Sequence, residues 1–280
     1  MMRSVAGWCR HLTAAVVVVG CALGVAAASR AALPATGAPE TQPIELRYAL
    51  RTAGFTVAEL ALSVASEAGT TIRSELTMRG QGLVQLFSGS FTRMVALTGA
   101  DGATEARPLA FEALYSKRDR TREIELRWGE DGQLTQATVS SQGRAAKPSE
   151  VPAALLQDAI DPLTALARLR AWLAAAGRAE GDTLTLPVFE GRKRLDLEAR
   201  TLAPATVRLD GRRADVARIE VRLIPRDGFE PDDMFVTWPD GPQRWFEVLV
   251  SADGRYAPLA VREEGRTVIE LTADCAAARC

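Results

Sequence analysis

Hydrophobic and polar residues alternate along most of the chain from residue 44 onward. In the first such run, Ile44, Leu46, Tyr48 and Leu50 alternate with residues that are mostly charged. This period of two is typical of a strand that lies with one face against a core. Comparable runs predict further strands over residues 55–64, 71–78, 91–97, 109–117, 121–128, 134–140, 183–189, 194–202, 215–225, 234–238, 243–251, 257–263 and 267–271.

Six Asp-Gly dipeptides punctuate these runs, beginning at Asp101, Asp131, Asp210, Asp227, Asp240 and Asp253. Asp-Gly accepts the positive φ angles that tight hairpin turns require. Hairpin-connected strands form antiparallel sheets, whereas parallel strands need a long crossover between them. The pattern therefore predicts a mainly β protein, with either one large antiparallel curved sheet or two half-barrels.

One segment, at about residues 150–177, has the period of a helix instead. Asp161 is a suitable N-cap, Pro162 suits the first helical position, and Gly177 suits the end. Between them, Leu166, Leu169, Trp172 and Leu173 recur at helical spacing. We expect one inserted amphipathic helix packed on the sheet; a helix that binds a partner or a membrane surface is the alternative.

The first 28 residues have the pattern of a signal peptide. Arg3, Arg10 and His11 precede an uncharged run from Leu12 to Ala28, which ends in small residues suited to cleavage. A membrane span needs about 20 apolar residues, so this run of small residues is short for an anchor. We expect export to the periplasm, followed by a Pro/Ala/Gly-rich linker over residues 29–43.

The signal segment also contains a possible lipidation site. Val18-Val19-Gly20-Cys21 resembles the bacterial lipobox, in which the cysteine is acylated and becomes the mature N-terminus. Residues 22–28 remain apolar, whereas lipoproteins usually turn polar after this cysteine. Both outcomes stay open: cleavage near Ala28, or an outer-membrane lipoprotein that begins at Cys21.

The last seven residues, 274–280, form a tail with a pair of cysteines. Cys275 and Cys280 are the two that remain after ordinary cleavage, and their spacing allows a small loop in an oxidising compartment. A structural disulfide and two free thiols are both compatible with this spacing. Redox activity is disfavoured, because the motif is not Cys-x-x-Cys.

Charge and composition narrow the chemistry. The 280-residue chain has a net charge of -1, which disfavours nucleic acid as a partner. The single histidine, His11, lies in the predicted signal segment, so the mature chain lacks histidine-based nucleophiles and imidazole ligands. The acidic run 227–233 lacks the spacing of a calcium loop. We expect no metal and no cofactor; a hydrolase that uses carboxylates alone stays open.

The densest basic run is the candidate ligand site. Arg118, Arg120 and Arg122 follow Lys117 in a predicted hairpin, and Arg side chains match the geometry of phosphate groups on envelope lipids. The alternative is a solvated hairpin tip, since charge runs are usually exposed faces. The runs 191–194 and 211–213 have the same basic character, and each begins with a glycine.

Several local patterns resemble a known family. The domain opens with Tyr48-x-Leu50, Gly54-Phe55 and Ala58-Glu59-Leu60-x-Leu62. The later motifs are Asp161-Pro162-Leu163-Thr164-Ala165-Leu166, Trp245-Phe246-Glu247-Val248, Pro258-Leu259 and Glu270-Leu271. In order and spacing this resembles the secreted bacterial family named domain of unknown function 3108, over a β domain at residues 44–273. The resemblance implies an exported cell-envelope protein and brings no catalytic residues with it. The fold is also similar, by analogy, to half-barrel lipoprotein carriers.

These features together predict a non-enzymatic protein of the cell envelope. We expect it to bind a lipid, another amphipathic envelope molecule or an envelope assembly partner, with membrane contact only through lipidation or at the surface. A scaffold that binds only proteins and a carboxylate-dependent hydrolase of envelope polymers are the alternatives.

Overall fold

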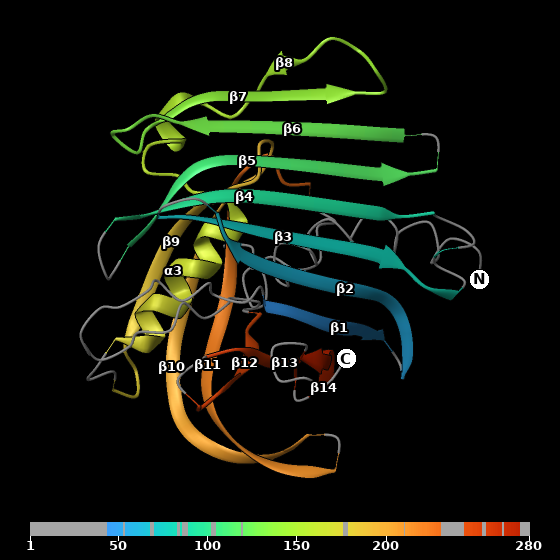
Figure 1. Cartoon of the computed structure of the whole chain (residues 1–280), viewed down its shortest axis with the longest axis vertical. Helices are drawn as coiled ribbons and strands as arrows, with labels where there is room; N and C mark the ends of the chain where they lie inside the picture. Colours follow the sequence, from blue (N-terminus) through green and yellow to red (C-terminus); the bar gives the residue numbers. More distant parts are fainter. Residues whose placement is uncertain are drawn as a thin grey trace.

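The structure, a computed structural model of the chain (Figure 1), describes residues 44–274 except 53, 68–69, 83–84, 86–88, 102–104, 119, 176–178, 210, 231–243, 254–255 and 265. The predicted signal segment with Cys21, the linker 29–43, the strand predicted over 234–238, and Cys275 and Cys280 lie outside the described residues. Among the described residues, no helix combines the length and the hydrophobicity that crossing a membrane requires.

Within the described residues, fourteen strands form one antiparallel sheet, which confirms the mainly β prediction. Their bounds are β1 Ile44–Thr52, β2 Phe55–Ser66, β3 Thr71–Gly80, β4 Phe91–Asp101, β5 Glu105–Lys117, β6 Arg120–Trp128, β7 Leu134–Ser141, β8 Lys147–Pro148, β9 Thr183–Phe189, β10 Arg194–Leu209, β11 Arg212–Asp227, β12 Phe246–Ser251, β13 Pro258–Glu263 and β14 Arg266–Asp274.

Two meanders, β1–β8 and β9–β14, join into this single sheet. The first and last strands pair with each other, with Tyr48 opposite Leu271, so the order runs β8 to β1 and then β14 to β9. The sheet curves strongly, and β9–β11 cross the direction of β3–β6 in the view of Figure 1. Its edges, β8 and β9, are not joined by a ladder of backbone hydrogen bonds between them. The fold therefore combines the two predicted alternatives: two curved halves that form one open sheet.

The helix α3, Pro162–Ala174, is shorter than the predicted 150–177, and only the short 3-10 turn Ala153–Leu155 precedes it. The carboxylate of Asp161 accepts hydrogen bonds from the amides of Leu163 (2.9 Å) and Thr164 (2.8 Å), which caps the first turn. A residue before proline is disfavoured in the helical region, and Asp161 is extended (φ -71°, ψ 162°). Pro162 therefore sets where the helix can begin.

Helix α3 lies on the concave side of the sheet and contacts β4, β5 and β9 (Figure 1). Its first five residues are all buried, so the expected amphipathic pattern holds only toward its C-terminal end. Large side chains fill the rest of this face, including Tyr48, Phe111, Phe189 and Phe246, each at most 1% exposed. Burial of such side chains is the main stabilising contribution to the fold.

Residues 149–161, which we call the strap, run between the two edges of the sheet. At one end, the amide of Ser149 donates to the carbonyl of Ala137 on β7 (3.0 Å). At the other, Ile160 forms a parallel bridge with Val188 on β9. Between them, the indole Nε1 of Trp128 donates to the carbonyl of Ala159 (2.9 Å). The strap thus connects the edges across the opening of the sheet.

The opposite, outer face of the sheet is covered by paired charges. Arg side chains on one strand form ion pairs with acids on the same or the next strand, as in Arg93–Glu75, Arg218–Glu247, Arg222–Glu198 and Arg226–Asp196, all with N–O distances of 2.5–2.7 Å. Arg200 and Arg222 also stack on the ring of Trp245, 5.2 and 4.7 Å from its centroid. These pairs explain most of the charged residues that alternate with the core positions.

Candidate functional site

The predicted Arg118, Arg120 and Arg122 lie on the β5–β6 hairpin, but in different environments. Lys117 and Arg120 form the last pair of the ladder, and Arg118 lies in the turn with a φ of 51°. Arg118 and Arg120 are exposed, whereas Arg122 is half-buried on the concave face, directly opposite Tyr115. The hairpin-tip interpretation therefore fits the first two residues, and Arg122 belongs to the interior edge of the sheet.

The turn between β9 and β10 meets the concave face beside Arg122. Gly191 in this turn has a φ of +101°, and a Cβ placed there would lie 2.3 Å from Cγ2 of Ile124 on β6. On its other side, a Cβ on Gly228 would lie 2.0 Å from the carbonyl oxygen of Arg192. Only glycine permits both close approaches. The turn is thus held between β6 and the end of β11.

Glu190, at the start of this turn, is a buried carboxylate. The hydroxyl of Tyr115 donates to its Oε2 (2.9 Å), while its Oε1 is buried and has no hydrogen-bond partner. Only 2% of Glu190 is exposed. Burial raises its pKa, although the hydrogen bond from Tyr115 and the charges of Arg192, Lys193 and Arg122 act in the opposite direction. Burial and the charge of Glu190 also raise the pKa of Tyr115.

We call two groups of basic side chains together the cationic cluster: Arg122, Arg192 and Lys193, whose charges act on Glu190, and Lys117, Arg118 and Arg120 at the adjoining tip of the β5–β6 hairpin. Burial, together with the charge of Arg192, lowers the pKa of Arg122. Lys193 is 8% exposed, and its Nζ lies 5.0 Å from the ring centroid of Phe229. Within the described residues, no ion pair includes Lys117, Arg118, Arg120, Arg122 or Arg192. This contrasts with the paired arginines of the outer face.

The cluster has the chemistry of an anion site. Guanidinium groups that form no ion pair, and that are partly shielded from water, bind phosphate or carboxylate more strongly than fully exposed ones. Glu190 adds a single acceptor oxygen to this basic surface. Apart from burial, the groups that shift the pKa of Glu190 are Tyr115, Arg192, Lys193 and Arg122, and none of these is a carboxylate. Nor do those residues hold a group of three or more His, Cys, Asp or Glu side chains that could bind a metal ion.

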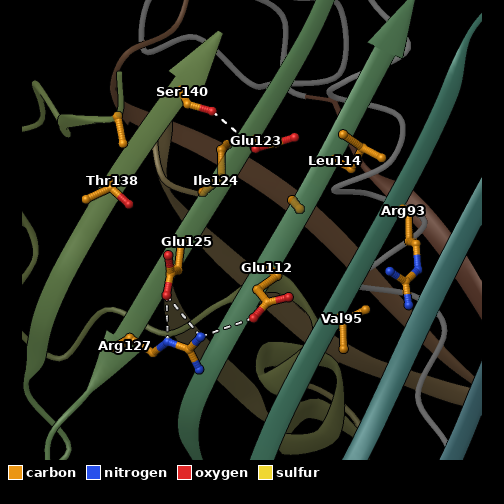
Figure 2. A pocket seen from close by; sticks show the side chains of 12 residues that line it. Arg93, Val95, Glu112, Leu114, Glu123, Ile124, Glu125, Arg127, Thr138 and Ser140 are labelled. Carbon is orange, nitrogen blue, oxygen red and sulfur yellow. Dashed lines mark hydrogen bonds and ion pairs between the residues drawn. The ribbon is translucent and has the colours of Figure 1, made fainter. Parts of the chain in front are cut away.

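A second candidate, a groove of about 510 Å³, crosses the outer face of β4–β7 (Figure 2). Several of its polar side chains contact one another: Arg127 contacts Glu112 (3.1 Å) and Glu125 (2.9 Å), and Glu123 accepts a hydrogen bond from Ser140 (3.4 Å). Figure 2 shows these side chains pointing into the groove, where they meet each other. Three carboxylates line the groove against two arginines, Arg93 and Arg127, so it offers an anionic ligand less than the cationic cluster does.

The family model described as "Protein of unknown function (DUF3108)" matches residues 45–267. The chain belongs to the DUF3108 family. A solved structure, a β-barrel-like protein of domain of unknown function DUF1849 from Brucella abortus, is 9% identical, with a TM-score of 0.44 over 82% of this chain and 96% of its own. No curated protein matches the sequence. Membership confirms the resemblance carried by the motifs at Tyr48, Gly54 and Asp161.

Sequence reasoning singled out Arg122 and the basic run 191–194 in this DUF3108 protein, but it did not name Tyr115 or Glu190. The basic turn at residues 191–194 was a visible signal for Arg192 and Lys193. Tyr115 and Glu190 had none, because neither belongs to a motif and their contact spans 75 positions. Such a contact depends on how the two meanders fold together.

Proposed function

We propose that this DUF3108 protein is an exported, non-enzymatic protein of the cell envelope that binds the anionic headgroup of an amphipathic lipid at the cationic cluster. One observation carries the proposal: Arg122 and Arg192, both half-buried beside Glu190, form no ion pairs within the described residues, while outer-face arginines such as Arg93, Arg218 and Arg222 are matched with acids. Arg122, Arg192 and Lys193 share one carboxylate, that of Glu190, so positive charge is in excess and its repulsion costs stability, which a bound anion would offset.

The arrangement of the strand ends supports contact with a membrane surface. β1 ends at Thr52, β2 starts at Phe55, β5 ends at Lys117 and β6 starts at Arg120, and the ladder registers place these ends on one rim of the sheet. Phe55 is 75% exposed. A basic rim with an exposed aromatic side chain suits the interface of an anionic membrane.

Because the concave face is filled, it leaves no room for the acyl chains of a lipid. Helix α3 and the large buried side chains pack this face, so we place only the headgroup at the cluster and leave the acyl chains in the bilayer. The predicted signal peptide, or lipidation at Cys21, would bring the protein to the periplasmic side of such a membrane. Nucleic acid is not expected as a partner of a chain with a net charge of -1.

Vesicle binding tests the proposal. We expect the protein to sediment with vesicles that contain phosphatidylglycerol and not with pure phosphatidylcholine. The double variant Arg122→Gln/Arg192→Gln should bind about 30-fold more weakly, at about 1 kcal/mol for each basic side chain near the surface. The matched control is Arg47→Gln/Arg73→Gln, which removes the same charge from the outer face.

Unchanged binding of the Arg122/Arg192 variant, or an equal loss in the control, would overturn the proposal. Organic extraction of protein purified from the envelope, followed by lipid mass spectrometry, tests it independently. Recovery of an anionic lipid with the wild-type protein and not with the double variant is the expected result. A protein scaffold would instead retain a polypeptide partner and no lipid.

A further inference from the structure

We infer that the headgroup bound at the cationic cluster carries free hydroxyl groups, and that Oε1 of Glu190 accepts a hydrogen bond from one of them. This inference rests on the proposed function and narrows its ligand class to a hydroxylated phosphoester, such as a glycerol phosphate or a sugar phosphate. The feature that an anion site alone does not explain is Oε1 of Glu190, which is buried and has no hydrogen-bond partner.

The geometry of Glu190 identifies the kind of group that it can bind. Its Oε2 accepts the hydrogen bond from Tyr115, and its Oε1, also buried, has no partner. A buried acceptor that stays unsatisfied costs free energy, so native proteins rarely keep one without a reason. An ionised carboxylate only accepts hydrogen bonds. The missing partner is therefore a donor, either a hydroxyl or an ammonium group.

The surrounding charge favours the hydroxyl. The charges of Arg192, Lys193 and Arg122 all act on Glu190, so an ammonium group here would meet three cations and one carboxylate. Such a net positive site disfavours a cationic ligand, whereas a neutral hydroxyl bears no such cost. A phosphate on the same molecule would meet the guanidinium groups nearby. One hydroxylated phosphoester satisfies both halves of the site.

A second unsatisfied group lies at the same end of the concave face. Thr92 on β4 pairs with Tyr115, and Ser90 directly precedes β4; both residues are buried. The hydroxyl of Ser90 is buried and has no partner. A ligand with several hydroxyl groups could satisfy Ser90 as well as Glu190, which a bare phosphate ion could not.

Titration calorimetry with two soluble probes tests the inference in the wild-type protein. We expect sn-glycerol 3-phosphate to bind at least about 10-fold more tightly than inorganic phosphate, the effect of one hydrogen bond to a charged acceptor. Glu190→Met, which keeps a similar side-chain length without an acceptor, should remove this preference while phosphate still binds. The matched control, Glu59→Met on the outer face, should keep the preference.

The outcomes separate this inference from the proposed function. Equal affinities of the wild-type protein for the two probes would overturn the hydroxyl inference and leave anion binding intact. Binding of neither probe, nor of anionic vesicles, would overturn the proposed function. A preference for phosphatidylglycerol over phosphatidic acid vesicles would assign the hydroxyls to a lipid headgroup. If the protein prefers sn-glycerol 3-phosphate over inorganic phosphate but does not distinguish the two kinds of vesicle, the hydroxyl inference is supported. The ligand is then a soluble phosphoester, which contradicts the lipid as ligand. The wild-type comparison needs no variant to fold.

Discussion

The hydroxyl of Tyr115 donates a 2.9 Å hydrogen bond to Oε2 of Glu190, and this bond joins the two meanders of the sheet across its concave side. Tyr115 belongs to β5 and Glu190 directly follows β9, so the partners come from opposite halves of the strand order. The two halves meet here through side chains and not through a backbone ladder. Neutralising or moving Glu190 is therefore expected to affect both stability and binding.

The variant Glu190→Gln should be more stable than wild type at pH 7.5. Burial raises the pKa of Glu190, so the folded protein binds this proton more tightly than the unfolded chain. The corresponding stability is present at low pH and is lost as pH rises through the raised pKa. Glutamine removes this loss. A gain of about 1 kcal/mol would raise Tm by about 2–4 °C.

Thermal unfolding at pH 4 and pH 7.5 measures this effect. The advantage of Glu190→Gln should shrink at pH 4, where wild-type Glu190 is increasingly protonated. Glu59→Gln, which removes an exposed carboxylate from the outer face, is the matched control for the loss of one negative charge. A variant that is less stable than wild type at pH 7.5 would mean that the carboxylate stabilises the cationic cluster more than its burial costs.

Gly228→Ala should destabilise the protein and weaken anion binding together. A Cβ at residue 228 would lie 2.0 Å from the carbonyl oxygen of Arg192, so the β9–β10 turn must move. Gly211→Ala is the matched control: its φ is also positive, +75°, but nothing lies within 4 Å of a Cβ there. The difference between the two variants isolates the steric effect from the cost of the backbone conformation.

Urea denaturation and vesicle sedimentation measure the two effects. We expect Gly228→Ala to lose about 1–3 kcal/mol of stability, as overpacked sites commonly do, and to bind anionic vesicles more weakly than Gly211→Ala. Equal losses in both variants would show that the turn tolerates displacement, in which case the position of Arg192 does not depend on Gly228.

The strand pattern was predictable because it is local. Alternation located the strands, and Gly132, Gly211 and Gly228, each after an aspartate, have the positive φ angles that the Asp-Gly turns predicted. One predicted strand end was wrong: the prediction ended the strand at residue 202, just before Pro204. In the structure β10 continues to Leu209, because a register shift between Leu202 and Ala205 accommodates the proline. Bulges of this kind accept a residue that lacks an amide donor.

The candidate site was only partly predictable because its contacts are long-range. Arg122 was visible in a basic run, but its half-buried position depends on strand alternation together with the arrival of the β9–β10 turn. Glu190 is one of 35 acidic residues, and its burial becomes apparent only once both meanders are folded. The Asp161 cap, in contrast, was predictable, since a helix N-terminus is a local motif.

Two variants of Asp161 separate the effect of its helix cap on stability from the effect of its charge. Burial raises its pKa to about 6, despite hydrogen bonds from Thr164 and Leu163. Its contribution to stability is therefore present below the unfolded pKa of about 3.9 and is lost as pH rises through about 6. Asp161→Asn keeps the cap and does not titrate, so it should gain stability relative to wild type between pH 4.5 and pH 7.5.

Asp161→Ala removes the cap itself and should lose about 1–2 kcal/mol of stability. Chemical denaturation at the two pH values measures both variants, with the exposed Asp158→Asn as the control for a general loss of negative charge. If Asp161→Asn and wild type keep the same stability difference at both pH values, the carboxyl group titrates in the folded protein as it does in the unfolded chain.

Phe55 tests whether the rim of the sheet touches the membrane. It is 75% exposed beside the β1–β2 turn, on the rim that also carries Lys117 and Arg120. Phe55→Ser should leave stability within about 0.5 kcal/mol of wild type, as exposed substitutions usually do. Binding to phosphatidylglycerol vesicles should fall by about 10-fold or more, since complete transfer of a phenyl side chain from water is worth about 1.5–3 kcal/mol. Phe55→Trp should preserve binding, because indole also partitions to the interface. Sedimentation of Phe55→Ser at wild-type levels would mean that the cationic cluster reaches the headgroups without insertion of this side chain.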